Sequence, residues 1–210
     1  MEEPTPLQRF INGILPENPT YRTLLGMCPT LAVTNNMASA LTMAGATTLT
    51  LVCSNIMISL MRKLIQPHLR ILVFTSTIAT FVTVVDYLLQ AFMPEMSQQL
   101  GPYIPLIIVN CIIISRCEAC SAKQGPVPAI ADGLGQGLGF CLGLASIATV
   151  REVLGSGTWL GMKVFPEGTW REWGIMVLPP GAFLTLGCLM AAVNYCIDKR
   201  KDGQGEQVNR

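Results

Sequence analysis

The sequence predicts an all-α integral membrane protein that forms a single membrane domain over residues 1–210, with six transmembrane helices in two inverted three-helix repeats. Three observations lead to this prediction: the composition, the lengths of the apolar stretches and the distribution of Lys and Arg. Half of the 210 residues are hydrophobic and only 13% are charged, against about 25% charged in an average soluble domain. No basic run is interleaved with aromatic residues, so nucleic acid is not an expected partner, whereas membrane lipid is.

The apolar stretches define the expected helices. About 20 apolar residues at 1.5 Å rise cross the hydrocarbon core of a bilayer. Four stretches reach this length, and they are 38–60, 71–93, 127–150 and 174–197. Two further segments, 24–33 and 103–115, are apolar but would cover only about half to two-thirds of the core as helices. The short segments are therefore the first helix of each expected repeat.

The basic residues indicate that both short segments cross the membrane. Lys and Arg accumulate in cytoplasmic connections. Six crossings place 11 basic residues on the cytoplasmic side and three outside, whereas two re-entrant short segments would give eight and six. We therefore expect six crossings with both termini in the cytoplasm.

The order of lengths is short, long, long, repeated once, which predicts repeats at about 22–95 and 103–198. Because each repeat contains three crossings, the second enters from the opposite side, and the repeats are related by an axis in the membrane plane. Proteins of this kind commonly place their site near the midplane on broken helices.

Each short segment carries one cysteine beside helix-disfavouring residues. Cys28 lies between Gly26 and Pro29, and Cys111 follows Pro105 in the second segment. Repeat symmetry would bring the two thiols together, and paired thiolates suit a soft metal centre. A [2Fe–2S] cluster normally takes four cysteines, so a related partner subunit would supply two more. The alternative is that both cysteines pack in the core, as buried cysteines ordinarily do.

Other motifs are interpreted structurally. Cys117 and Cys120 form a single CxxC without a nearby histidine, which is weak evidence for metal and is interpreted as a cytoplasmic surface pair. The glycines between 133 and 143 match no phosphate-binding motif; the i,i+4 spacing of Gly133/Gly137 and Gly135/Gly139 indicates close helix packing instead.

Ionisable residues within apolar spans are the remaining candidates, because a charge in the bilayer is costly. Asp86 and Asp132 are candidates for an ion path. The pairs Arg116/Glu118 and Arg151/Glu152 flank helix ends, where an interfacial salt bridge or snorkelling is the simpler explanation. No residue pattern indicates hydrolytic catalysis, so no catalytic residue is predicted.

Several stretches resemble the RnfE/NqrD family, and the resemblance covers nearly the whole chain. They are 24–34 (LLGMCPTLAVT), 110–119 (NCIIISRCEA), 125–128 (GPVP), 132–133 (DG), 151–157 (REVLGSG) and 178–183 (LPPGAF). The first and last of these look more like the E subunit of the Rnf complex than like the quinone-reductase branch. Where the family commonly reads Arg-Ala-Glu-Ala-Phe, this chain has Cys117 and Cys120, which favours a structural role for that CxxC.

The resemblance implies a function and partners. It implies a multi-pass subunit of the bacterial inner membrane, without catalytic activity alone, in a ferredoxin:NAD oxidoreductase that couples electron transport to Na⁺ or H⁺ translocation. It further implies that Cys28 and Cys111 ligate a [2Fe–2S] cluster shared with an RnfA-like homologous subunit, and that other Rnf subunits carry flavins and iron–sulfur clusters. The alternatives are an inverted-repeat secondary transporter and a structural scaffold subunit.

Overall fold

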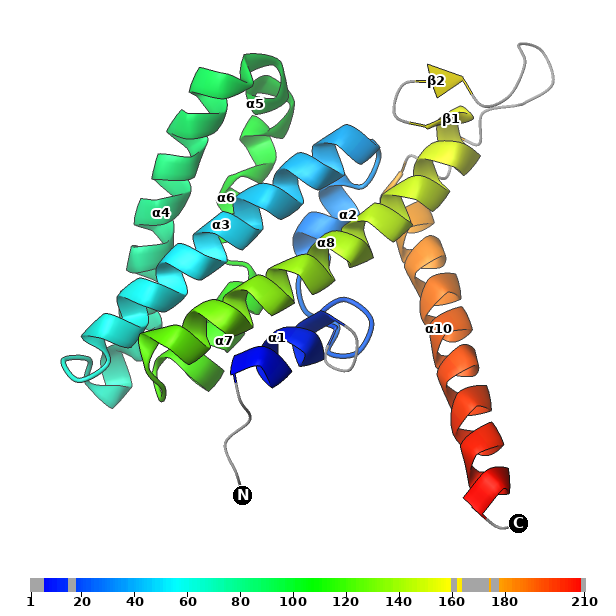
Figure 1. Ribbon diagram of the computed structural model, residues 1–210. Helices are drawn as coiled ribbons and strands as arrows, with labels where there is room; N and C mark the ends of the chain where they lie inside the picture. The colour runs from blue at the N-terminus through cyan, green and yellow to red at the C-terminus, as the bar shows by residue number, and fades with distance from the viewer. Residues whose placement is uncertain (1–5, 15–17, 160–161, 164–173, 175–177, 209–210) are drawn as a thin grey trace.

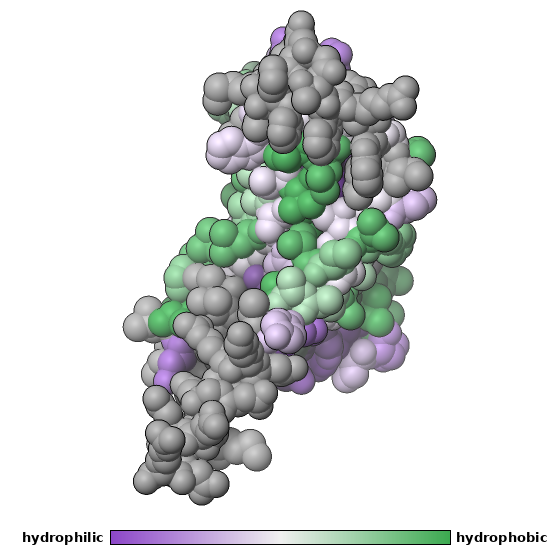
Figure 2. All heavy atoms as spheres, turned by 90° about the vertical axis from the view of Figure 1, so that its right-hand side faces the viewer, coloured by the Kyte–Doolittle hydropathy of each residue, from purple (hydrophilic) through white to green (hydrophobic). Residues whose placement is uncertain are grey.

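The computed structural model describes residues 6–14, 18–159, 162–163, 174 and 178–208. This part of the chain is helical, as predicted, apart from one antiparallel pair of two-residue strands, β1 (Thr158–Trp159) and β2 (Met162–Lys163). On the face in Figure 2, apolar side chains gather across the middle of the molecule and hydrophilic ones lie nearer its lower end. This distribution suits a protein whose middle is surrounded by lipid.

Two long antiparallel helices, α3 (Met37–Met61) and α8 (Pro126–Ser156), form the centre of the bundle (Figure 1). Gly133 and Gly137 of α8 face α3: a Cβ added to Gly137 would lie 2.3 Å from the Cγ2 of Thr48. Only glycine permits this approach, so the prediction that the glycines mediate close helix packing is confirmed.

Two further long helices flank this pair. A short 3₁₀ turn, η1 (Pro67–Leu69), leads into α4 (Arg70–Phe92), which packs on α3; α10 (Pro179–Val208) packs on α8. Among the described residues, three helices are long and apolar enough to cross a membrane: α3, α8 and Pro67–Phe92. They match three of the four predicted long spans, and α10 covers most of the fourth.

The two predicted short segments hold helices shorter than their apolar stretches, in line with the helix-disfavouring residues beside each cysteine. In the first, helix α2 begins only at Met27 and ends at Val33. The second, predicted at 103–115, lies within a longer run of short elements: α5 (Pro94–Leu100), η2 (Gly101–Tyr103), α6 (Pro105–Ile108), α7 (Cys111–Arg116) and a π-helical turn, η3 (Cys117–Ser121). The halves 94–103 and 105–121 meet at a bend of 57°; counted as one span, they raise the candidate crossings to four. Proline at the start of α5 and α6 explains two of the interruptions, since proline lacks the N–H that continues a helix.

A helix that the sequence did not reveal precedes these elements. Helix α1 (Pro6–Ile14) packs along the glycine face of α8 that points away from α3. A Cβ on Gly135 would lie 2.6 Å from the carbonyl oxygen of Phe10, and one on Gly139 would lie 2.4 Å from that of Gly13. Helix α1 and the end of α10 lie at the same end of the bundle (Figure 1).

Candidate functional site

The site predicted at the two cysteines begins with a glycine that no other residue can replace without strain. Gly26 has φ 78° and precedes the first residue of α2. A Cβ there would lie 2.5 Å from Cδ1 of Ile112 and 2.8 Å from Cε2 of Phe140. The left-handed backbone turns the chain into α2, where Cys28 is the second residue and is exposed. Pro29 is tolerated because the first helical turn needs no N–H donors.

The second cysteine lies at a matching helix start. Asn110 caps α7, and its side-chain oxygen accepts a hydrogen bond from the Ile112 N–H at 3.1 Å. Cys111 is the first residue of α7 and is partly exposed. Each cysteine therefore occupies the first turn of a short helix that starts at a helix break, meaning a short stretch of non-helical backbone.

A direct contact joins the two breaks. The backbone N–H of Gly26 donates to Sγ of Cys111 at 2.8 Å, across 85 positions of sequence. The starts of α2 and α7 therefore meet, as repeat symmetry predicts for the two short segments. Both cysteines are therefore close to this junction. Whether the two thiols bind a cluster stays a prediction.

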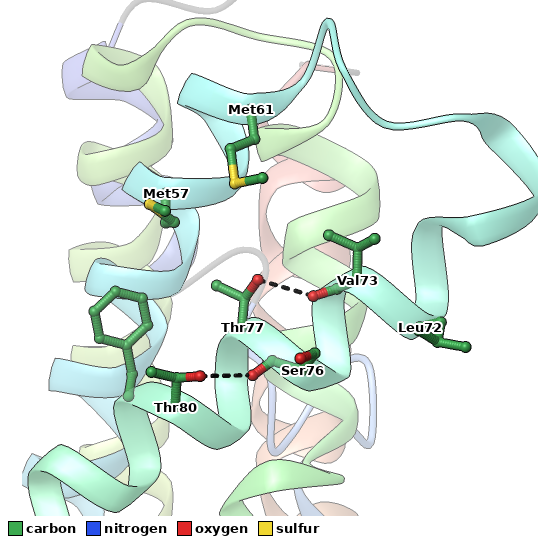
Figure 3. A pocket seen from close by; sticks show the side chains of 8 residues that line it. Met57, Met61, Leu72, Val73, Ser76, Thr77 and Thr80 are labelled. Carbon is green, nitrogen blue, oxygen red and sulfur yellow. Dashed lines mark hydrogen bonds between the residues drawn. The ribbon is translucent and has the colours of Figure 1, made fainter.

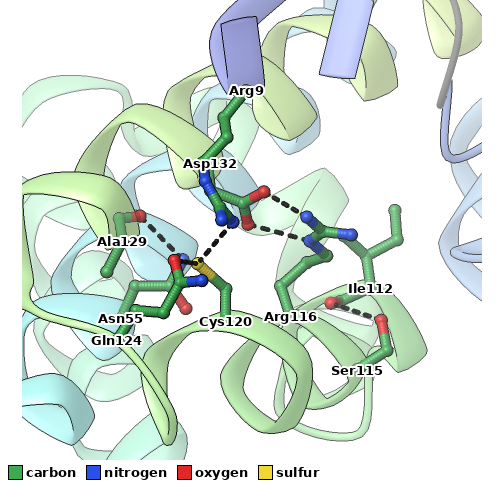
Figure 4. Close-up of polar contacts among 9 residues, drawn as sticks. All are labelled: Arg9, Asn55, Ile112, Ser115, Arg116, Cys120, Gln124, Ala129 and Asp132. Carbon is green, nitrogen blue, oxygen red and sulfur yellow. Dashed lines mark hydrogen bonds and ion pairs between the residues drawn. The ribbon is translucent and has the colours of Figure 1, made fainter. Parts of the chain in front are cut away.

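The two candidate ion-path carboxylates have different surroundings. Asp132, which is 2% exposed, receives two hydrogen bonds from Arg116: one from Nε at 2.8 Å and one from Nη2 (Figure 4). Its charge is thus balanced by a guanidinium within the bundle. Asp86 lies on α4 and accepts a hydrogen bond from Nε2 of Gln90 at 3.0 Å, one turn away.

The CxxC pair is buried, so the prediction of a cytoplasmic surface pair is wrong. Cys117 and Cys120 are 0% and 1% exposed. Cys117 Sγ donates to the side-chain oxygen of Asn55 at 3.5 Å, and Arg9 of α1 donates to Cys120 Sγ at 3.8 Å. Figure 4 shows Cys120, Arg9 and Asn55 next to the Arg116 and Asp132 pair. The π-helical turn directs both thiols towards the interior of the bundle. Helix α1, near the N-terminus of the chain, packs close to Cys120.

The charged pairs at helix ends also have partners other than those expected. Glu118 pairs with Arg70 at 3.0 Å rather than with Arg116. Arg151 and Glu152, expected at the interface, are 2% and 3% exposed. Their described contacts reach the turn between α2 and α3 and, from Arg151, also the carbonyl oxygen of Leu178 just before α10.

Grooves lie on the outer faces of the bundle, away from Cys28 and Cys111. One, of about 400 Å³, runs between α3 and α4 beside Met57, Met61 and Thr77 (Figure 3). The hydroxyl of Thr77 donates to the carbonyl of Val73 at 2.8 Å and that of Thr80 to the carbonyl of Ser76 at 3.0 Å, so the wall presents few free polar groups. Within the described ranges, no group of three or more His, Cys, Asp or Glu is placed to hold a metal ion.

Comparison with known proteins adds family information to this geometry. A family model described as "Rnf-Nqr subunit, membrane protein" matches residues 6–190. The E subunit of the Na⁺-translocating ferredoxin:NAD⁺ oxidoreductase complex of Acetobacterium woodii is 44% identical over 189 residues, 90% of this chain and 96% of the relative. The proton-translocating counterpart of Clostridium ljungdahlii is 37% identical over 203 residues, 95% of each chain.

The quinone-reductase branch is similar as well. The D subunit of the Na⁺-translocating NADH-quinone reductase of Aeromonas salmonicida is 42% identical over 188 residues, 88% of this chain and 90% of the relative. These three relatives are therefore named as subunits of complexes that translocate ions, two with Na⁺ and one with H⁺.

Proposed function

The chain belongs to the Rnf-Nqr family of membrane subunits, and we propose that it is the E-type subunit of a redox-driven ion pump, a ferredoxin:NAD⁺ oxidoreductase of Rnf type. In this proposal Cys28 and Cys111 are two ligands of a [2Fe–2S] cluster, and a homologous membrane subunit supplies the other two. The hydrogen bond from the Gly26 N–H to Cys111 Sγ is the observation that carries it, because it brings the two cysteine-bearing breaks together.

The residues present fit half of such a cluster. Four cysteines normally hold a [2Fe–2S] group, and two cysteines lie at this junction with one side chain exposed and the other partly exposed. Neither cysteine is fully buried, so the junction is open to a partner surface. The Gly26 N–H donates to the sulfur of Cys111, and a hydrogen bond of this kind would help to orient that sulfur as a cluster ligand. When bound, the cluster would supply one-electron transfer within the membrane.

The arrangement of helices supports two inverted repeats. In the first, the break at Gly26 is followed by α2, α3 and α4; in the second, the break at Asn110 is followed by α7, α8 and α10. The central helices α3 and α8 are antiparallel neighbours, as an in-plane axis requires (Figure 1). With both broken segments crossing, the chain has six crossings in the bacterial inner membrane and both termini in the cytoplasm.

The proposed partners follow from the same reasoning. The chain does no chemistry alone: it assembles with an RnfA-like subunit at the cluster and with other Rnf subunits that carry flavins and iron–sulfur clusters. The coupled ion is Na⁺ or H⁺, since E-type relatives are named for both ions.

Replacing the two cysteines in the assembled complex tests the proposal. Cys28→Ser and Cys111→Ser should each lower the iron content by about one [2Fe–2S] cluster per complex and abolish ferredoxin-dependent NAD⁺ reduction. Cys188→Ser, which alters an exposed cysteine on α10, is the matched control and should retain both. Full iron content and activity in the first two variants would show that these cysteines only pack.

A further inference from the structure

Helix α8 carries three buried charged residues. Two of them contact the far ends of the short helices that carry the cysteines, and the third contacts the first residue of α3, after the turn that follows α2. The three are Asp132, Arg151 and Glu152, which are at most 3% exposed. A charge buried in an apolar bundle is costly unless its contacts compensate for it. The contacts of these three residues therefore indicate which segments their charged groups position.

Arg151 and Glu152 make hydrogen bonds to the turn that joins α2 to α3. Arg151 Nη1 donates to the hydroxyl of Thr34 at 2.6 Å and to the carbonyl oxygen of Leu31 at 3.4 Å. Its Nη2 also donates to the carbonyl oxygen of Leu178, just before α10, at 3.4 Å. Glu152 accepts a hydrogen bond from the backbone N–H of Met37 at 2.8 Å, at the first residue of α3. The cation thus lies at the C-terminal end of α2 and the anion at the N-terminal end of α3, which is the arrangement that helix dipoles favour.

Asp132 contacts α7, the short helix that begins with Cys111. It receives two hydrogen bonds from Arg116, the last residue of α7, whose first residue is Cys111. Each cysteine is thus at the start of a short helix, and the far end of that helix is bound by a buried charge on α8.

The spacing on α8 places the cysteines between the two anchor points. Arg151 follows Asp132 by 19 residues, or about 28 Å along a helix, close to the roughly 30 Å hydrocarbon core. Helices α2 and α7 begin together at the Gly26 and Cys111 contact and end at opposite anchors. A single helix, α8, therefore contacts the far end of α2 and the far end of α7.

We propose that Arg151 and Glu152, together with the Asp132 and Arg116 pair, are positioning residues that set the relative placement of Cys28 and Cys111 as cluster ligands. This inference rests on the proposed function. A role confined to folding would change only the stability or the amount of the protein. A positioning role changes the cluster that remains bound, because ligand geometry and the surrounding hydrogen bonds set its potential.

The test is a redox titration of the intramembrane [2Fe–2S] EPR signal in the purified complex. Arg151→Gln and Glu152→Ala should shift the midpoint potential and broaden the signal, with Arg151→Lys as a milder replacement that keeps the charge. Glu152→Gln retains an oxygen that can accept from the Met37 N–H and should stay near wild type. Arg62→Gln is the matched control, because Arg62 donates to the carbonyl of Lys123 at 3.4 Å at an exposed site; its signal should be unchanged.

The outcomes separate this inference from the proposed function. A signal that survives Cys28→Ser and Cys111→Ser overturns the proposed function. A signal that is lost in those variants but keeps its wild-type midpoint and line shape in Arg151→Gln and Glu152→Ala overturns the positioning role alone. Failure of Arg151→Gln and Arg151→Lys to accumulate, with a wild-type signal in Glu152→Ala, would also overturn it by showing that the contacts serve folding.

Discussion

The backbone N–H of Gly26 lies 2.8 Å from the Sγ of Cys111, although 85 positions separate the two residues. This contact joins the starts of α2 and α7 and brings together the two chain breaks that carry the cysteines. Its geometry depends on a residue with positive φ and no side chain.

A methyl group at Gly26 should disturb the junction. Gly26→Ala places Cβ against Ile112 and Phe140 and requires the left-handed backbone, so we expect a loss of roughly 2–4 kcal/mol from overpacking and strain combined. Thermal unfolding of the complex in detergent measures it. Gly45→Ala is the control, because nothing lies within 4 Å of its added Cβ. Equal melting temperatures for the two variants would contradict the assigned strain.

A methyl group at Gly137 should separate α3 from α8. The added Cβ would overlap the side chain of Thr48, and overpacking of this kind costs about 1–3 kcal/mol. Because Thr48 causes the overlap, Thr48→Ala should recover part of the stability lost in Gly137→Ala. A double variant whose loss equals the sum of the single losses would show that the two residues do not meet. Thermal unfolding again provides the measurement.

Loss of the Asp132 carboxylate should be costly. Asp132→Asn leaves the Arg116 guanidinium beside a neutral amide, and breaking a buried ion pair costs about 3–5 kcal/mol; we expect the lower end, because Arg116 keeps 20% of its side chain exposed. Glu118→Gln breaks the Arg70 pair, in which both side chains are about a third or more exposed, and should cost less than about 1 kcal/mol. Similar unfolding free energies for both variants would contradict the burial argument.

Much of the fold follows from the sequence because long apolar runs in a membrane protein have few alternatives to helices. The residues that break helices were also informative: Gly26 and Pro105 flank the segments in which α2 and α7 begin late. The meeting of these segments was predictable from repeat parity, and their interrupted helices were predictable from the glycine and prolines beside the cysteines. The residues at which the short helices begin were not predictable, since these depend on the Asn110 cap and the fit of Gly26 against Ile112.

The features that sequence reasoning missed depend on contacts between distant segments. Helix α1 is short, and its stability comes from the glycine face of α8 more than 120 positions later. The same docking brings Arg9 to Cys120 and encloses the CxxC. Glu118 and Arg116 were assigned to each other by proximity in sequence, whereas the fold pairs them with Arg70 and Asp132.

The central claim is that Cys28 and Cys111 ligate a [2Fe–2S] cluster, and EPR spectroscopy of the reduced complex carrying Cys111→Ser tests it most directly. The account predicts that the intramembrane [2Fe–2S] signal disappears in this variant and persists in Cys188→Ser. An intramembrane signal of wild-type intensity and line shape in Cys111→Ser would contradict the account.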